Sequence, residues 1–123
     1  MPITPSAIAT PQEMRFPIGG GRTAVCLSGY PVFSFKGSGG SWRREELWIN
    51  IGPVWRRLDD VCPSVAPAAL ANSHHAVNAG WAVDWCAWTT MGGRILLRCG
   101  IAIRDSDGFL LRVVYHVNSV GII

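Results

Sequence analysis

Apolar and polar residues alternate along the C-terminal third of the chain. The two-residue period is that of a β-strand with one buried face, and it recurs in three segments. These segments are 81–90, 95–104 and 109–118. Glycine-containing turns separate them, at 91–93 and 106–108, and such short turns join antiparallel neighbours. The pattern therefore predicts a three-stranded antiparallel meander.

The first turn of this meander has two interpretations, and they give different registers. A three-residue loop at 91–93 aligns Trp85 with Cys99 and gathers the apolar side chains on one face. A two-residue loop made of the two glycines pairs Cys86 with Cys99 instead and turns Asp84 onto the apolar face. We favour the three-residue loop because it buries no lone carboxylate. It also places the two thiols on opposite faces, which predicts that they are not bonded.

The favoured register brings polar side chains together on the second face of the meander. They are Asp84, Cys86, Trp88, Arg98, Arg104, Arg112, His116 and Asn118. In a catalytic interpretation Asp84 orients His116, which acts as a base or deprotonates Cys86. Arg98, Arg112 and Trp88 would then bind the ligand. The alternative is a row of structural ion pairs on the outside of a sheet.

The N-terminal half predicts an arm followed by more strands. Residues 1–21 hold four prolines and end in three glycines, which excludes a long helix and predicts an arm that grips a neighbouring surface. Residues 22–123 form a single domain. Short strands are predicted at 22–27, 32–36 and 43–51.

Between residues 53 and 79 the pattern predicts helix. Pro53 suits the first position of a short helix, and the alanine-rich stretch from Pro67 favours a second one. The fold class is therefore mainly β, a small antiparallel barrel or sandwich of six to seven strands with a short helical excursion. The alternative is an α+β fold in which an antiparallel sheet packs on a longer helix.

The composition favours burial of surface beyond a single small core. Hydrophobic residues make up 49% of the 123 residues and charged residues 15%, against about 25% charged in typical soluble domains. A chain of this size with so few charges favours a large subunit interface or a ligand cavity. The net charge of +3 comes almost entirely from arginines that are scattered along the chain, which argues against a nucleic-acid partner.

Several other classes of function lack a signal. The chain has no uninterrupted run of about 18 apolar residues, so no membrane partner is predicted. The first ten residues lack the basic segment of a secretory signal, so we expect an intracellular or virion setting with free thiols. The cysteine spacing matches no zinc pattern, and we predict neither a metal nor a cofactor.

Two functions remain. The first is a structural subunit of a homo-oligomeric assembly, such as a component of a virion or other shell, in which the N-terminal arm makes subunit contacts. The second is a small-molecule enzyme or binding protein with a pocket in a β-barrel that uses Asp84 and His116. The first depends on composition and the arm, and the second depends on the polar cluster alone.

Overall fold

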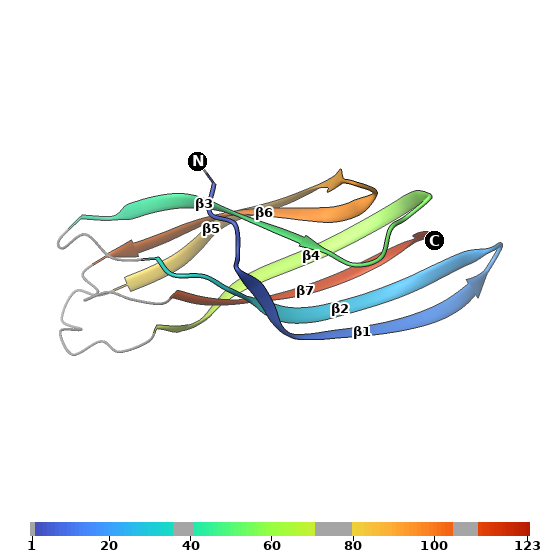
Figure 1. Cartoon of the computed structure of the whole chain (residues 1–123), viewed down its shortest axis with the longest axis horizontal. Coiled ribbons are helices and arrows are strands. Elements are labelled where there is room, and N and C mark those ends of the chain that lie inside the picture. Colours follow the sequence, from blue (N-terminus) through green and yellow to red (C-terminus); the bar gives the residue numbers. More distant parts are fainter. Residues whose placement is uncertain (1, 36–40, 71–79, 105–110) are drawn as a thin grey trace.

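The computed structural model describes residues 2–35, 41–70, 80–104 and 111–123. Seven strands run through them: β1 (Ala7–Gly19), β2 (Arg22–Val32), β3 (Arg43–Ile51), β4 (Arg57–Leu70), β5 (Gly80–Met91), β6 (Arg94–Arg104) and β7 (Leu111–Ile122). They form one sheet in the order β1-β2-β7-β4 and a second in the order β3-β6-β5. All strand pairs are antiparallel, and the two sheets form the layers of a sandwich (Figure 1).

The chain crosses repeatedly between the two sheets. Only β1-β2 and β5-β6 are hairpins within one sheet, whereas the passages β2 to β3, β3 to β4, β4 to β5 and β6 to β7 each change sheet. This is the kind of winding found in jelly rolls, which build two sheets from interleaved strands. The predicted β-rich sandwich is confirmed, and the sheets do not close into a barrel.

The core lies between the sheets and is built from the alternating residues of the central strands. On β6 the inward side chains are fully buried: Ile95, Leu97, Cys99, Ile101 and Ile103. Strand β7 contributes Val113, Tyr115 and Val117, which are equally enclosed. Burying an aliphatic or aromatic side chain of this size contributes roughly 1.5–3 kcal/mol. The alternation in the sequence therefore identified the inner faces of both strands.

The predicted meander is wrong in its third strand. β6 lies between β3 and β5, whereas β7 lies between β2 and β4 in the other sheet. The predicted turn at 106–108 falls outside the described residues. Alternation determines which face of a strand is buried, but it does not determine the neighbouring strand. On β3, Leu47 and Ile49 offer β6 the same apolar match that β7 would have offered.

The register of the β5-β6 hairpin combines both predicted alternatives. Next to the turn, Cys86 pairs with Cys99, as the two-residue loop requires. Gly92 and Gly93 have φ values of 63° and 78°, which suit the tight turn of a two-residue hairpin. A bulge between Val83 and Trp85 then shifts the pairing by one residue. Asp84 occupies the bulge, so the two-residue loop buries no carboxylate, and the reason for preferring the longer loop disappears.

The predicted helix after Pro53 is a strand. β4 spans Arg57–Leu70, and the second predicted helix overlaps its end and then enters residues 71–79, outside the described residues. Val61 and Val65 point inward at the spacing of a strand. Pro63 and Pro67 are tolerated because β4 is an edge strand, where a missing N–H breaks no ladder. No helix that could span a membrane occurs among the residues that the structure describes.

The N-terminal segment connects the edges of the two sheets. The Ile3 N–H donates to the Glu46 carbonyl at 2.7 Å, and the Trp48 N–H donates to the Ile3 carbonyl at 3.0 Å. The chain then enters β1, which pairs with β2 along the edge of the other sheet. The segment that we predicted as an arm therefore bonds to the middle of the β3 edge and supplies an edge strand of its own.

We expect the thiols to react in an order set by this fold. Cys62 is exposed on β4, whereas Cys99 is fully buried and burial raises the pKa of its thiol to about 12. Because the thiolate is the reactive form, iodoacetamide at pH 8 should modify Cys62 first and Cys99 only after unfolding. Peptide mass analysis over time measures the order. Alkylation of Cys99 at the rate of Cys62 in the folded protein would contradict the assigned core.

Candidate functional site

The structure does not assemble the predicted polar cluster. Asp84 and Arg98 lie on the outer face of the β3-β6-β5 sheet, whereas His116 lies on the outer face of the other sheet, opposite Ser28 and Ser64. The core of the sandwich separates the two faces. The predicted relay from Asp84 through His116 is therefore wrong, because it assumed that β7 was the neighbour of β6.

The remaining members of the predicted cluster are also dispersed. Cys86 and Trp88 face the inner side of the sandwich, opposite Cys99 and Leu97. Burial raises the pKa of the Cys86 thiol, which disfavours its nucleophilic thiolate. The Arg112 guanidinium lies 4.5 Å from the centre of the Tyr30 ring, on the same sheet as His116. No two of the predicted catalytic groups form a reactive pair.

The outer face of β3-β6-β5 carries a different group of residues, which we call the Trp–Arg face. It consists of Glu46, Trp48, Trp85 and Arg98. Glu46 accepts hydrogen bonds from the Trp48 indole at 2.7 Å and from the Arg98 Nε at 2.6 Å. The Arg98 guanidinium lies 5.5 Å from the centre of the Trp48 ring and 6.0 Å from that of Trp85, within cation–π range.

The Trp85 indole lies against Gly100 of β6. A Cβ atom at Gly100 would approach the Trp85 Cδ1 to 2.6 Å, and the Nε1 more closely still. The β5 bulge is what turns Trp85 outward beside Asp84, which pairs with Arg44 at 3.2 Å. The predicted register missed Trp85 because it assigned this residue to the core. The alternation of residues 43–51 already placed Glu46 and Trp48 on one polar face.

A hollow of about 300 Å³ lies beside Trp85 and is lined mainly by charged side chains. Arg44, Glu46 and Asp84 each have a partner of opposite charge here. Hydrogen bonds from Trp48 and then Arg98 lower the pKa of Glu46, which favours the ionised carboxylate over the protonated form that a general acid needs. The Trp–Arg face can therefore provide aromatic and guanidinium contacts, but it offers no activated nucleophile.

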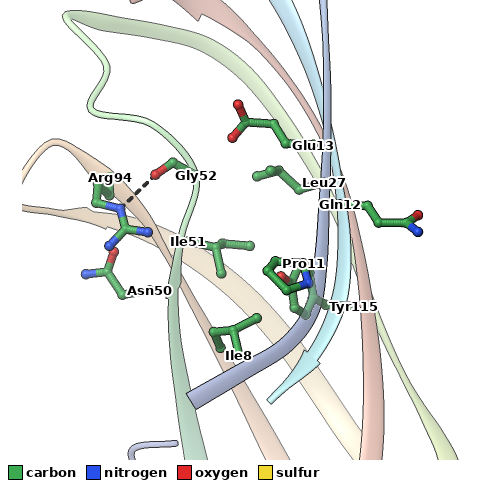
Figure 2. Close-up of a pocket in the computed structure, with 10 residues that line it drawn as sticks. All are labelled: Ile8, Pro11, Gln12, Glu13, Leu27, Asn50, Ile51, Gly52, Arg94 and Tyr115. Atoms are coloured by element: carbon green, nitrogen blue, oxygen red, sulfur yellow. Dashed lines mark hydrogen bonds between the residues drawn. The ribbon is translucent and has the colours of Figure 1, made fainter. Parts of the chain in front are cut away.

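A second hollow, of about 380 Å³, opens between the sheets at the side of β1 and β3 (Figure 2). Ile8, Leu27 and Ile51 line its apolar part, and Figure 2 shows Ile51 pointing across the gap toward Leu27. Arg94 at its border donates through Nε to the Gly52 carbonyl at 2.7 Å. Glu13 is held by Arg15 at 2.5 Å. This cleft suits an apolar group, and none of the described residues that line it is a histidine or a cysteine.

The largest uncovered apolar side chains of β1 lie in its second half, and Ile18 among them falls at a pairing irregularity between Pro17 and Gly19. Met14, Phe16 and Ile18 are 59%, 47% and 43% exposed. Met14 pairs with Cys26 and Phe16 with Ala24, whose partners on β7 are the outward residues Asn118 and Val120. We call this group the β1 stripe. It belongs to the outside of the sandwich.

Neither metal chemistry nor a known relative adds to this picture. The described residues contain no group of three His, Cys, Asp or Glu side chains that could hold a metal ion. Comparison of the chain with protein-family models, with curated proteins and with solved structures finds no match. The surfaces themselves are therefore the basis for assigning a function.

We predict that Gly100→Ala destabilises the protein through Trp85. The new methyl group would overlap the indole, and such overpacking costs roughly 1–3 kcal/mol. Urea denaturation of the wild type, Gly100→Ala, Trp85→Ala and the double variant measures the coupling. In the Trp85→Ala background the cost of the methyl group should nearly vanish. Equal costs in both backgrounds would show that Trp85 does not lie on Gly100.

We also predict an acid-sensitive contribution from Glu46. Because its pKa is lowered from 4.5, the charged form stabilises the fold above pH 4.5, and this contribution is lost as the pH falls through the lowered folded-state value. The melting temperature of Glu46→Gln should therefore lie below that of the wild type at pH 7 and approach it near pH 3. Trp48→Phe, which removes one of the two side-chain hydrogen bonds to this carboxylate, should shift the acid loss to higher pH. A constant gap between pH 7 and pH 3 would contradict the assignment.

Proposed function

We propose that the protein is a structural subunit of a homo-oligomeric assembly and that β1 makes contacts between subunits. The observation that carries this proposal is the inverted polarity of the second half of β1, which begins after the pairing irregularity between Ala9 and Gln12. Its residues on the inner side of the sheet, Glu13 and Arg15, are charged, although they pair with Leu27 and Val25 of the core. Its residues on the outer side are the β1 stripe.

An edge strand of a monomeric sandwich has the opposite pattern. Its apolar side chains face the core and its charged side chains face water. Ile8, near the start of β1, keeps that usual pattern and packs against the core. In the second half of β1 the apolar side chains Met14 and Phe16 instead point away from the core, on a hairpin that extends past the rest of the sandwich (Figure 1). Three large apolar side chains so exposed on one strand favour coverage by another surface. With 49% hydrophobic and only 15% charged residues, a second copy of this chain is itself a suitable cover.

The winding of the chain is compatible with a shell. Jelly rolls are used by capsid proteins, among other classes, so a virion or other shell component is one assembly of the proposed kind. Because one fold serves many functions, this likeness supports the proposal only as an analogy. The β1 stripe is the stronger support, since it concerns particular side chains.

The small-molecule alternative has less support. Asp84 and His116 lie on different sheets, so they do not share a pocket. The cleft in Figure 2 has an apolar floor, and its charged border residues Glu13 and Arg94 are engaged with Arg15 and Gly52. A cleft of this kind accepts an apolar group without performing chemistry on it.

We predict that Phe16→Lys reduces the mass of the assembly and leaves the sandwich folded. Phe16 is 47% exposed and lies outside the core, so its replacement removes little intramolecular packing while placing a charge in the proposed contact. Light scattering measures the mass, and circular dichroism measures the melting transition. Phe16→Leu keeps the stripe apolar and should retain the wild-type mass. An unchanged mass for Phe16→Lys would contradict the proposed role of β1.

A further inference from the structure

We propose that strand β5 pairs with β5 of a second copy in an antiparallel arrangement, with the two-fold axis at Trp88. This inference rests on the proposed function and names a second contact within the same assembly. It depends on a comparison of the four sheet edges, on the sequence of residues 85–91 and on the exposure of three large side chains.

Three of the four edges are protected against strand addition. β1 contains Pro11 and Pro17, each at an irregularity in its pairing. β4 contains Pro63 and Pro67, and proline offers no N–H to a further strand. The edge of β3 is occupied at its middle by the two backbone hydrogen bonds of Ile3 with Glu46 and Trp48, and its first half is highly charged (residues 43–46). These are the usual devices by which sheet edges avoid edge-to-edge association.

In the part of the chain that the structure describes, the second half of the β5 edge carries none of these devices. Among the described residues β5 pairs with β6 alone. Residues 85–91 contain no charge, no proline and no glycine, and they include two tryptophans and two threonines. Alternate residues of an antiparallel strand direct their N–H and C=O groups to opposite sides, so half of these groups point away from β6. An uncharged edge of this length is a template for pairing.

The ends of this segment define the symmetry of the pairing. The bulge at Asp84 interrupts the regular edge on one side, and the turn at Gly92 ends it on the other. The regular edge therefore runs from Trp85 to Met91, and residue 88 is its midpoint. A two-fold axis perpendicular to the sheet at that residue uses the whole segment in both copies, as an isologous dimer requires.

This axis covers the large exposed side chains of β5. It places Trp85 opposite Met91 of the partner subunit and Trp88 opposite Trp88 of the partner subunit. Those three residues are 43%, 46% and 40% exposed in the single chain. An axis at residue 87 would instead pair Met91 with Val83 beyond the bulge, and one at residue 89 would set Trp85 against Gly93 in the turn. The axis at Trp88 is the one that pairs large apolar side chains with each other.

The resulting contact differs from that of the β1 stripe. β5 lies on the side of β4, whereas the N-terminal segment and β1 lie on the side of β3. Pairing through β5 joins two three-stranded sheets into one of six strands. The β1 stripe on the far side of each copy stays available. A subunit with two separate contact surfaces can extend beyond a dimer.

A charge-swap experiment tests the pairing. Ala87 and Thr89 are exposed in the single chain, and the proposed axis sets each opposite the other in the partner. In Ala87→Glu/Thr89→Glu, like charges oppose each other across the contact, whereas in Ala87→Glu/Thr89→Lys opposite charges meet. Both double variants carry the same new carboxylate at position 87, beside Arg98, so the effect of that neighbour cancels. Both are made in the Phe16→Lys background, which isolates the β5 contact from the β1 contact.

Sedimentation velocity across a concentration series measures the monomer–dimer equilibrium. We expect the Glu/Glu variant to dissociate at least about tenfold more readily than the Glu/Lys variant, with similar melting transitions for the isolated chains. Equal dimer dissociation constants, or no dimer for the Glu/Lys variant, would overturn the pairing. Either of these two results would exclude the β5 contact but not the proposed function. The proposed function stands as long as Phe16→Lys alone reduces the mass of the wild-type assembly. A wild type that is monomeric at every concentration would overturn both.

Cysteine cross-linking tests the position of the axis. In either type of antiparallel pair, directly opposed Cα atoms lie about 4.5–5.5 Å apart, within reach of a disulfide. Oxidised glutathione should therefore join two copies of Trp88→Cys through residue 88, as identified by peptide mass. Ala87→Cys and Thr89→Cys, tested separately, oppose a different residue and should not form symmetric links. A symmetric link through residue 87 or 89 would move the axis, and no link through any of the three would exclude the contact.

Discussion

The enclosed inner faces of β6 and β7 are the constraint on which the rest of the structure depends. Each of these strands is flanked by two others in its sheet, and the inward side chains of each are almost completely shielded from solvent. Because both strands need cover on their inner face, they occupy different layers and face one another across the core. A meander would have placed them side by side and left one apolar face uncovered. The crossings between sheets follow from this need.

Different parts of the fold were predictable from the sequence to different degrees. The period-two pattern identified the strands of the hairpin and the inner face of β6, because burial on one side leaves a direct trace in the residue order. It did not identify β3 as the neighbour of β6, because Leu47 and Ile49 of β3 show the same apolar alternation as Val113 and Tyr115 of β7. Strand β4 was mistaken for helix because of its prolines and alanines. Proline is tolerated both on an exposed edge strand and at the first position of a helix, so its presence does not distinguish the two.

The predicted polar cluster was wrong for the same reason, namely the wrong neighbour for β6. Joining Asp84, Arg98 and His116 required both a register and a neighbour, and the neighbour was not encoded in the alternation. What the outer face of β3-β6-β5 holds instead depends on one bulged residue. The bulge turns Asp84 and Trp85 outward together, and Gly100 leaves the space that the indole occupies. No periodic pattern indicates such a bulge, although the two-glycine turn makes one necessary if Val83 is to face the core.

The four sheet edges are the feature of the fold that bears most directly on the proposed assembly. A sandwich of this size has four edges, and this chain protects three by different means: irregular proline positions, a proline-bearing strand and the backbone of its own N-terminus. Protection of this kind matters most where association must be restricted to one edge. A chain that protected no edge would associate without order, and one that protected all four would gain nothing from the uncharged second half of β5. Among the residues that the structure describes, three protected edges and one open edge fit the single strand partner proposed above, and the outward apolar side chains in the second half of β1 would add contacts through a face rather than an edge.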